Sequence, residues 1–299
     1  MIDRYPASFA NITTWARANH IPVAEARKRF AQYAVLRAVT GSRTLSELLV
    51  FKGGNALDFI WQPNRSTTDL DFSADMTMLA DDWDPDILIE QFRVPLIPAL
   101  DAVGRTLGVR LRLQKFVKQP PTGRKFATYA ASIAYALADE QRNRERIERG
   151  EPIAATSPLE ISLNEPICAD ERIDLHGTFR LRVSTLEDIV AEKLRALLQQ
   201  VLRNRTRRQD LLDIAVILKS GQPLDPTRIA EYLQRKAAAR NIPVSRAAFR
   251  DPALAERAQQ DYAALAATTR TLFIPADEAL RLILDFIATL PIPEGIAPS

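Results

Sequence analysis

Two aspartates separated by one residue have the clearest potential for chemistry in this chain. Asp69 and Asp71 lie near the end of the segment 51–72, which reads FKGGNALDFIWQPNRSTTDLDF. Turn-forming residues followed by alternation predict a strand over residues 64–72. Because side chains alternate between faces along a strand, both carboxylates share one face, about 7 Å apart. Leu70 and Phe72 lie on the other face and can anchor it in a core.

Such a pair of carboxylates is typical of a site for a divalent cation. Like charges this close repel each other unless a positive charge lies between them. Mg²⁺, or Mn²⁺ in its place, takes hard oxygen ligands from one or two carboxylates together with substrate phosphates. Arg65 and Thr67 are predicted on the same strand face as the aspartates. The alternative is a tight turn followed by a strand with solvated aspartates.

Two consecutive glycines, Gly53 and Gly54, precede the acid pair. Glycine lets backbone N–H groups approach a ligand closely and supports turns that form anion-binding nests. Asn55 is predicted to be the N-cap of a short helix over residues 55–60. A helix N-terminus next to a metal-binding acid pair suits a triphosphate. The loop is not of the Walker type, because no G-x-x-x-x-G-K-[ST] sequence occurs.

The run KGGNAL followed by RSTTDLDF resembles the nucleotidyltransferase signature of the AbiEii/AbiGii toxin family, which includes the mycobacterial MenT toxins. The family pattern is KGG-[TS]-x-L, followed by R-x-[ST]-x-D-x-D. The residues that match it are Lys52, Gly53, Gly54, Arg65, Thr67, Asp69 and Asp71. Asn55 stands where the family commonly has Ser or Thr, and its amide can contact a phosphate in place of the hydroxyl.

The resemblance implies an α+β fold, with a polymerase-β-like nucleotidyltransferase mixed sheet and flanking helices, followed by a helical C-terminal domain. It also implies a metal-dependent toxin that transfers a nucleotide from an NTP to RNA, foremost to the tRNA 3′ end, and releases pyrophosphate. A cognate antitoxin is then an expected partner. The residues implied to bind the nucleotide in this segment are Lys52, Gly53, Gly54, Asn55, Arg65 and Thr67, with Asp69 and Asp71 as catalytic metal ligands.

A third carboxylate is expected from PLEISLN at residues 158–164. Its alternation predicts a short strand with Leu159 and Ile161 on one face and Glu160 on the other. In the resembling family this strand often reads I-[DE]-[IV], which makes Glu160 the candidate third metal ligand. An exposed glutamate without a role in the site is the alternative.

From Ser184 the pattern changes to helices, so we expect one domain over residues 1–183 and a second over 184–299, which completes the nucleotide site. The run STLEDIVAEKLRALLQQVL predicts a helix over residues 184–202, with Lys193 beside an apolar stripe. A-E-K-L-x-A-L followed by R-D-x-x-D-I resembles a second signature of the family. It implies that Lys193 contacts the triphosphate and that Asp210 orients Lys193 or a bound base, both as catalytic residues.

Arginines fill the turn before this second signature. Asp210 and Asp213 lie three residues apart, on one side of the helix that follows. Gln209 stands where the family often has Arg, and the residues that can take that role are Arg205, Arg207 and Arg208.

The remaining elements follow from periodicity and turn signals. A helix is predicted over residues 23–40, and another over 85–107 that Pro95 and Pro98 should break or kink. The charged segment 139–151 is expected to be a mobile loop or an exposed helix. Further strands are predicted at residues 109–117, 126–137 and 179–183, and further helices at 226–240, 252–266 and 276–289.

Composition excludes several classes of protein. The 299 residues carry 40 Lys and Arg against 37 Asp and Glu, a formal net charge of +3. Local basic segments therefore matter more than the global field, so the charge allows a nucleic-acid partner without requiring one. With the RNA acceptor that the family resemblance implies, residues 105–112, 115–125 and 203–208 could guide the RNA backbone. The chain has a single cysteine, Cys168, which excludes an intramolecular disulfide. One cysteine and two histidines also argue against a zinc finger or a structural zinc site. We expect a cytoplasmic protein without a secretory signal or membrane span.

Two other functions remain compatible with these residues. A nucleotidyltransferase acting on a small molecule or a protein would keep the fold and change the acceptor, and the basic segments argue against an acidic acceptor cleft. A degenerate NTP-binding module would keep the fold without the reaction. Intact Asp69, Asp71 and Lys193 count against that reading.

Overall fold

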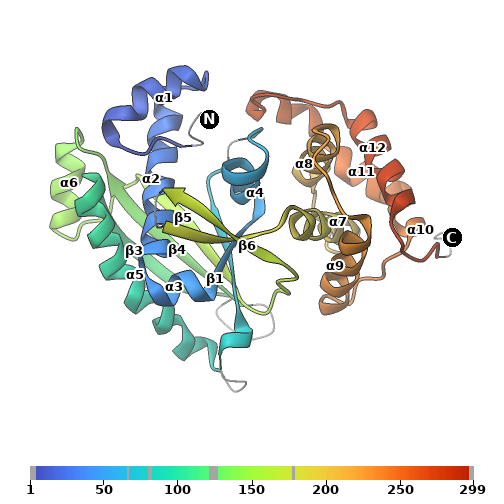
Figure 1. Cartoon of the computed structure of the whole chain (residues 1–299), viewed down its shortest axis with the longest axis horizontal. Coiled ribbons are helices and arrows are strands. Elements are labelled where there is room, and N and C mark those ends of the chain that lie inside the picture. The colour runs from blue at the N-terminus through green and yellow to red at the C-terminus, as the bar shows by residue number, and fades with distance from the viewer. Residues whose placement is uncertain (1–4, 66, 80–82, 121–126, 177–178, 296–299) are drawn as a thin grey trace. The chain divides into compact units, whose positions relative to one another are not determined.

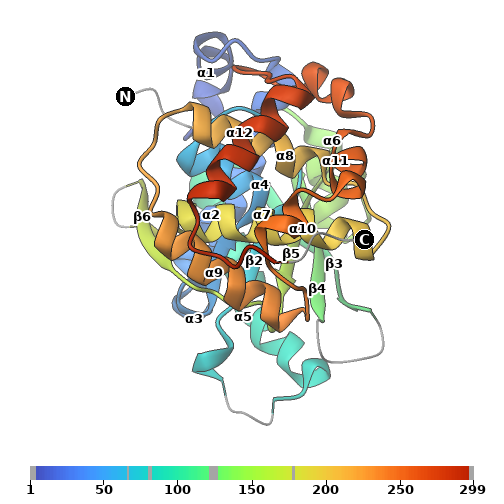
Figure 2. The same ribbon diagram turned by 90° about the vertical axis from the view of Figure 1, so that its right-hand side faces the viewer.

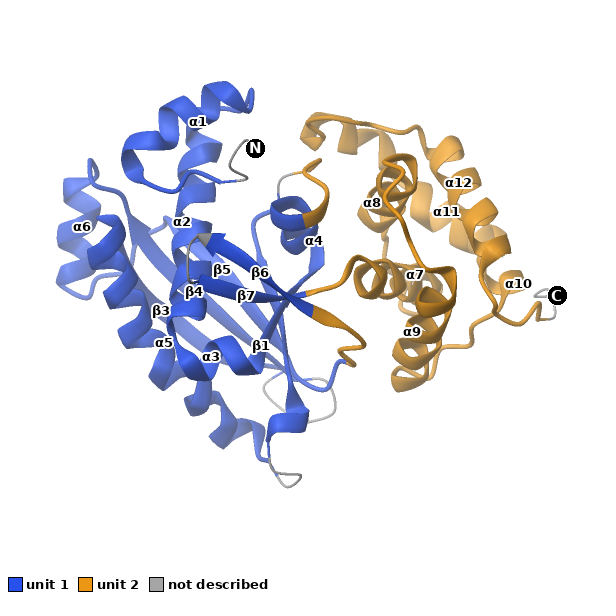
Figure 3. Cartoon of the chain, viewed as in Figure 1, with its two compact units in different colours: residues 1–60, 67–165, 171–183 blue, residues 61–66, 166–170, 184–299 orange. Residues whose placement is uncertain are grey.

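The computed structural model (Figure 1) describes residues 5–65, 67–79, 83–120, 127–176 and 179–295. The chain divides into two compact units (Figure 3). The first, here called the sheet unit, comprises residues 1–60, 67–165 and 171–183. The second, the helical unit, comprises residues 61–66, 166–170 and 184–299. Each unit is therefore assembled from separate pieces of chain.

The sheet unit is built on a seven-stranded sheet in the order β3-β4-β5-β2-β1-β7-β6. The sheet is mixed, because β2 pairs parallel with β5 and antiparallel with β1. The strands are β1 (Leu49–Lys52), β2 (Leu70–Ala74), β3 (Arg110–Gln119), β4 (Thr128–Ala136), β5 (Thr156–Ser162), β6 (Asp170–His176) and β7 (Phe179–Ser184). The predicted strands at 109–117, 126–137, 158–164 and 179–183 are confirmed to within two residues. The strand predicted over residues 64–72 is wrong in its start, because β2 begins only at Leu70.

One face of this sheet is apolar and is covered by two long helices, α2 (Val23–Gly41) and α5 (Pro85–Leu107). Leu70, Phe72 and Tyr129 on that face are fully buried. The Tyr129 ring packs on Phe92 of α5, with ring centroids 5.7 Å apart. Burial of each large apolar side chain contributes about 1.5–3 kcal/mol, which fixes the face on which β2 presents its polar residues.

The remaining helices of the sheet unit are α1 (Ile12–Ala18), α3 (Arg43–Leu48), α4 (Gly53–Ala56), which continues into a π-helical turn at Leu57–Trp61, and α6 (Gln141–Glu148). The middle of the charged segment 139–151 thus forms helix α6, and the residues on either side of it are not helical. The expected break in α5 is not observed, because one helix runs through both Pro95 and Pro98. Neither proline is among the buried residues of α5, whose buried side includes Phe92 and Leu96. The packing of that side stabilises the helix by more than the loss of the two proline hydrogen bonds destabilises it.

The helical unit comprises α7 (Leu186–Leu202), α8 (Arg208–Lys219), α9 (Pro226–Ala239), α10 (Arg246–Phe249), α11 (Pro252–Gln259) and α12 (Ala276–Thr289). Helix α7 contacts α8, α9 and α11, and α12 packs on α8 (Figure 2). The helix predicted over residues 252–266 is two elements, α11 and a 3₁₀ turn at Tyr262–Thr268. Among the described residues, no helix is both long and apolar enough to cross a membrane.

Candidate active site

A glycine with a left-handed backbone lies against the second aspartate of the acid pair. Gly53 has φ of +73°, and a Cβ built on it would lie 2.5 Å from the Asp71 Oδ2. Lys52, just before it, is paired with Asp71 across β1 and β2. Only glycine fits at residue 53, because any side chain would both strain the backbone and displace the carboxylate. Gly53 therefore makes room for the Asp71 carboxylate.

Glu160 lies next to Asp71 in the sheet. The two residues are register partners on the parallel strands β2 and β5. Partnered positions on adjacent strands are about 4.8 Å apart and point to the same face, here the face opposite Leu70 and Phe72. Asp69 precedes β2 by one residue, is exposed, and accepts a hydrogen bond of 3.0 Å from the Thr68 hydroxyl through Oδ1.

These three carboxylates have the donor chemistry that Mg²⁺ or Mn²⁺ takes. The described residues contain no group of three His, Cys, Asp or Glu side chains already gathered for a metal ion. A Cβ at residue 53 would collide with the Asp71 carboxylate, so glycine at this position allows Asp71 to lie where it does. The residues therefore fit a hard cation as ligands, with Asp71 and Glu160 as neighbours.

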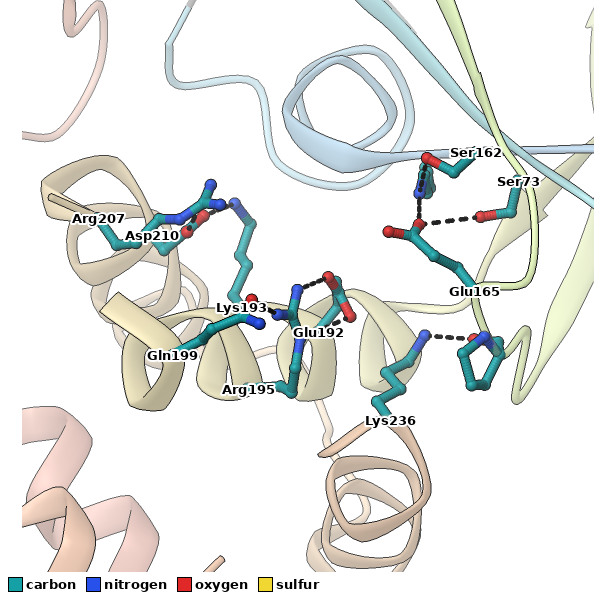
Figure 4. A network of polar contacts seen from close by, with 12 residues as sticks. Ser73, Ser162, Glu165, Glu192, Lys193, Arg195, Gln199, Arg207, Asp210 and Lys236 are labelled. Atoms are coloured by element: carbon teal, nitrogen blue, oxygen red, sulfur yellow. Dashed lines mark hydrogen bonds and ion pairs between the residues drawn. The ribbon is translucent and has the colours of Figure 1, made fainter. Parts of the chain in front are cut away.

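Lys52 has partners that the sequence did not point to. Its Nζ forms an ion pair with Glu165 and donates to the Ser162 Oγ at 3.1 Å. Ser73 also donates to Glu165, at 3.5 Å, and Figure 4 shows Glu165 with both serines. Lys52 thus neutralises a carboxylate beside the acid pair. Glu165 was missed because it follows β5 in a loop, outside any strand pattern.

Asn55 does not cap a helix. Helix α4 begins at Gly53, with Lys52 in the N-cap position, so Asn55 lies inside it. Its side chain is 1% exposed and donates from Nδ2 to the Asp69 carbonyl at 2.7 Å. The prediction of an N-cap was wrong because the left-handed Gly53 starts the turn two residues earlier. Asn55 instead connects the glycine turn to the backbone of the acid segment.

The second signature forms a buried charge network within the helical unit, and Figure 4 shows its Lys193 and Asp210. Lys193 is 6% exposed, and its Nζ contacts the Asp210 Oδ1 at 2.9 Å and the Asp213 Oδ2 at 2.8 Å. Burial alone would lower the pKa of Lys193, but Asp210 and Asp213 outweigh it and hold the pKa above its usual range. Burial would likewise raise the pKa of Asp213, but Lys193 and Arg65 keep it below its usual range. Lys193 and Asp213 therefore stay charged near neutral pH.

Arg65 belongs to this network and not to the face of β2. Its Nη2 lies 3.2 Å from the Asp213 Oδ2, and its backbone forms an isolated bridge with Thr269. The predicted position on the strand face was wrong because β2 begins only at Leu70 and Asn64, the neighbour of Arg65, is bonded to the backbone of Leu272. Asn64 donates to the Leu272 carbonyl at 3.0 Å and accepts from the Leu272 N–H at 2.8 Å.

Thr67 is also outside the strand, and its buried hydroxyl has no hydrogen-bond partner among the described residues. Of the arginines before Asp210, Arg207 lies 3.9 Å from the Asp210 Oδ2. Arg208 pairs with Asp261 instead, at 3.5 Å. Arg207 thus contacts Asp210, whereas Arg208 contacts a residue outside the signature. Asp213 is the central acid of the network, and the three-residue spacing from Asp210 was its signal in the sequence.

A search of solved structures finds similar folds. MenT4, a nucleotidyltransferase toxin from Mycobacterium tuberculosis, aligns with a TM-score of 0.57 and 18% identity over 94% of this chain and 89% of that chain. JHP933 from Helicobacter pylori aligns with a TM-score of 0.48 and 16% identity over 88% of this chain and 91% of that one. The likeness to MenT4 shows a shared fold. A search of curated proteins gives no match.

The sequence itself gives a stronger assignment. Residues 35–282 match the family described as "Nucleotidyl transferase AbiEii toxin, Type IV TA system". The match includes both signatures, from the glycine turn and acid pair to Lys193 and Asp210. It covers most of the 299 residues and agrees with the mixed sheet and its flanking helices. The chain therefore belongs to the AbiEii family of nucleotidyltransferase toxins from type IV toxin–antitoxin systems.

Proposed function

We propose that this protein transfers a nucleotide from an NTP to an RNA acceptor, with the tRNA 3′ end as the favoured acceptor. The observation that carries the proposal is the register of Asp71 with Glu160, with the Asp71 carboxylate close against the Gly53 backbone. Two adjacent carboxylates and a close backbone suit the phosphates and metal of an NTP. The family also implies a cognate antitoxin that restrains the reaction.

Asp69, Asp71 and Glu160 would hold one or two Mg²⁺ or Mn²⁺ ions. When bound, the metal supplies charge neutralisation at the triphosphate and activates the acceptor hydroxyl. The role of the chain is to position these groups, because phosphoryl and nucleotidyl transfer depend on alignment and charge more than on covalent catalysis. Gly53 leaves room for the Asp71 carboxylate to lie against the backbone.

Lys193 would bind the triphosphate as a compact positive charge. Its raised pKa keeps the ammonium protonated at any physiological pH. Asp210 and Asp213 hold its Nζ in place, and Arg65 balances the second carboxylate. A buried lysine with two acids is costly unless all charges are paired, so the network fixes the position of Lys193 before substrate arrives.

Part of the basic sequence remains available for an RNA backbone. Arg110 pairs with Glu148 at 2.8 Å, and Lys118 pairs with Asp86 at 2.6 Å, so neither has a free charge. Lys115 and Arg205 are exposed on the described surface. The part of segment 115–125 beyond residue 120 lies outside the described residues. Phosphate contacts of this kind would weaken as salt concentration rises.

The test is a transfer assay without a chosen acceptor. The protein is incubated with each radiolabelled NTP, total RNA and Mg²⁺, and with Asp71→Asn as the inactive control. We expect label in an RNA of tRNA size, removable by RNase and absent with Asp71→Asn. Label in a protein or a small molecule would assign another acceptor, and NTP binding without any transfer would indicate a degenerate module.

A further inference from the structure

Two side-chain amides hold the backbone just before the acid pair. Gln32 of α2 donates from Nε2 to the carbonyls of Thr67 and Thr68, each at 3.0 Å. Asn55 of α4 donates from Nδ2 to the carbonyl of Asp69 at 2.7 Å. Three consecutive carbonyls of the sheet unit thus accept hydrogen bonds from two side chains. We call this arrangement the amide clamp.

The amide clamp binds a stretch of backbone that lies outside the strands of the sheet. Strand β2 begins at Leu70, so the backbone of residues 67–69 has no place in the ladder. Asp71, in contrast, is held on both sides, by Lys52 of β1 and Glu160 of β5. The direction of the Asp69 carboxylate relative to Asp71 therefore depends on contacts outside the sheet.

Both amides are buried and rigidly supported. Gln32 is 7% exposed, and Asn55 is 1% exposed. One turn before Gln32, Arg29 forms a buried ion pair with Asp58 and stacks on the Phe59 ring, with its Cζ 4.2 Å from the ring centroid. These contacts fix α2 to the chain that follows α4. Because both amides are fixed by their helices, α2 and α4 determine the position of the backbone at residues 67–69.

The bonds of Asn55 favour a positioning role. A carbonyl oxygen only accepts hydrogen bonds, so the amide nitrogen of Asn55 must face Asp69. This orientation leaves the Asn55 Oδ1 buried without a partner among the described residues. An unpaired buried acceptor costs stability, so the residue is poorly explained by stability alone. What it provides is a fixed Asp69 backbone.

We propose that Gln32 and Asn55 are positioning residues that set the direction of Asp69 and thereby the metal affinity of the acid pair. The link to catalysis rests on the proposed nucleotidyl transfer, whereas metal binding is a separate property of the same residues. Outer partners that orient a ligand typically change metal affinity by about 10-fold when they are removed.

The test measures binding of Mn²⁺ alone, by the EPR signal of the free ion, without nucleotide or acceptor. Gln32→Met keeps the length of the side chain and removes both donors. Asn55→Ala removes the third donor and gives a second variant if Gln32→Met does not fold. The matched control is Gln114→Met, because Gln114 also bonds to backbone in the sheet unit, donating to the Ile153 carbonyl at 3.3 Å and accepting from its N–H at 3.0 Å. Hydrogen exchange of residues 67–71 is followed in each protein.

We expect the two clamp variants to bind Mn²⁺ about 10-fold more weakly and to exchange faster at residues 67–71. Gln114→Met should keep both properties of the wild type. Unchanged Mn²⁺ affinity in a folded clamp variant would overturn the proposal. The proposal would also fail if the wild type showed no saturable Mn²⁺ binding, or if Asp71→Asn did not abolish that binding. If the Mn²⁺ shift is observed but the wild type transfers no nucleotide, the clamp stands and the proposed function fails.

Discussion

Asp71 and Glu160 are partners in the register of two adjacent parallel strands. The third candidate carboxylate is therefore held by the sheet itself, with no loop between it and Asp71. Asp71 has the Gly53 backbone on one side and Glu160 on the other, whereas Glu160 is exposed. The two acids should contribute unequally to the site.

We expect Asp71→Asn to reduce nucleotide transfer by at least about 100-fold, as for loss of a central electrostatic group. Glu160→Gln should reduce it by about 10-fold and raise the metal concentration needed for half-maximal rate. Glu171→Gln, an exposed glutamate on β6, is the matched control and should be neutral. Equal activity of Glu160→Gln and wild type at limiting metal would remove Glu160 from the site.

Gly53→Ala separates backbone strain from the clash with Asp71. Gly108 has a similar φ of +69° but open space around its would-be Cβ, so Gly108→Ala measures the strain alone. Gly108→Ala should lose about 1–2 kcal/mol in free energy of unfolding, measured with denaturant, and Gly53→Ala should lose more because its methyl group also meets Asp71. Only Gly53→Ala should lose transfer activity, because only its methyl group meets the Asp71 carboxylate. Full activity in Gly53→Ala would show that the close approach is unimportant.

Lys193→Ala should weaken NTP binding and nearly abolish transfer. Lys193→Arg should rescue only in part, since a planar guanidinium does not replace a compact charge. Lys236 is the matched control, a second buried lysine of the helical unit that pairs with Asp188 at 3.0 Å and donates to the Pro166 carbonyl at 2.8 Å. Lys236→Met should lower stability while NTP affinity, measured by calorimetry on folded protein, stays the same. Wild-type NTP affinity in Lys193→Ala would contradict the assigned role.

The buried charge network also predicts that the free energy of unfolding depends on pH in the acid range. The folded-state pKa of Asp213 lies below its usual value, so its contribution to stability is complete above the unfolded-state pKa, about 4. That contribution is lost as pH falls through the folded-state pKa. Asp213→Asn should lose about 3 kcal/mol at pH 7 and then show a shallower decline below pH 4 than wild type. Parallel unfolding curves against pH would contradict this.

Expression of the active protein should slow growth of a host that lacks the antitoxin. Asp71→Ala should relieve this effect, because it removes one of the central carboxylates of the site. Growth rate is measured at matched protein level, checked by immunoblot. The same slowing with Asp71→Ala would mean that toxicity does not come from the acid pair.

The sequence predicted the features that depend on residues close in the chain, such as the face of Asp71. It missed the positions that depend on contacts with residues far along the chain, such as that of Arg65. Alternation around Leu70 and Phe72 was enough to place Asp71 on the polar face. Arg65 continues the same alternation, yet the distant Leu272 holds its neighbour Asn64 outside the sheet. Only tertiary structure reveals such a choice.

Gln32 illustrates the same limit from inside a helix. It lies among buried apolar residues of α2, and a polar residue at a core position was its only signal in the sequence. Its partners, the carbonyls of Thr67 and Thr68, lie 35 and 36 residues further on. Glu160 was proposed from family likeness, and its register with Asp71 required the sheet.

The discontinuous helical unit has a consequence for synthesis of the toxin. Arg65 and its partner Asp213 are separated by 148 residues, and Asn64 and Leu272 by 208. On the ribosome, the acids of the sheet unit emerge long before Asp213 exists. A product of premature termination before residue 213 contains Asp69, Asp71 and even Lys193, but it cannot form the Arg65–Asp213 pair. Translation must therefore pass residue 213 before the charge network of this unit can close.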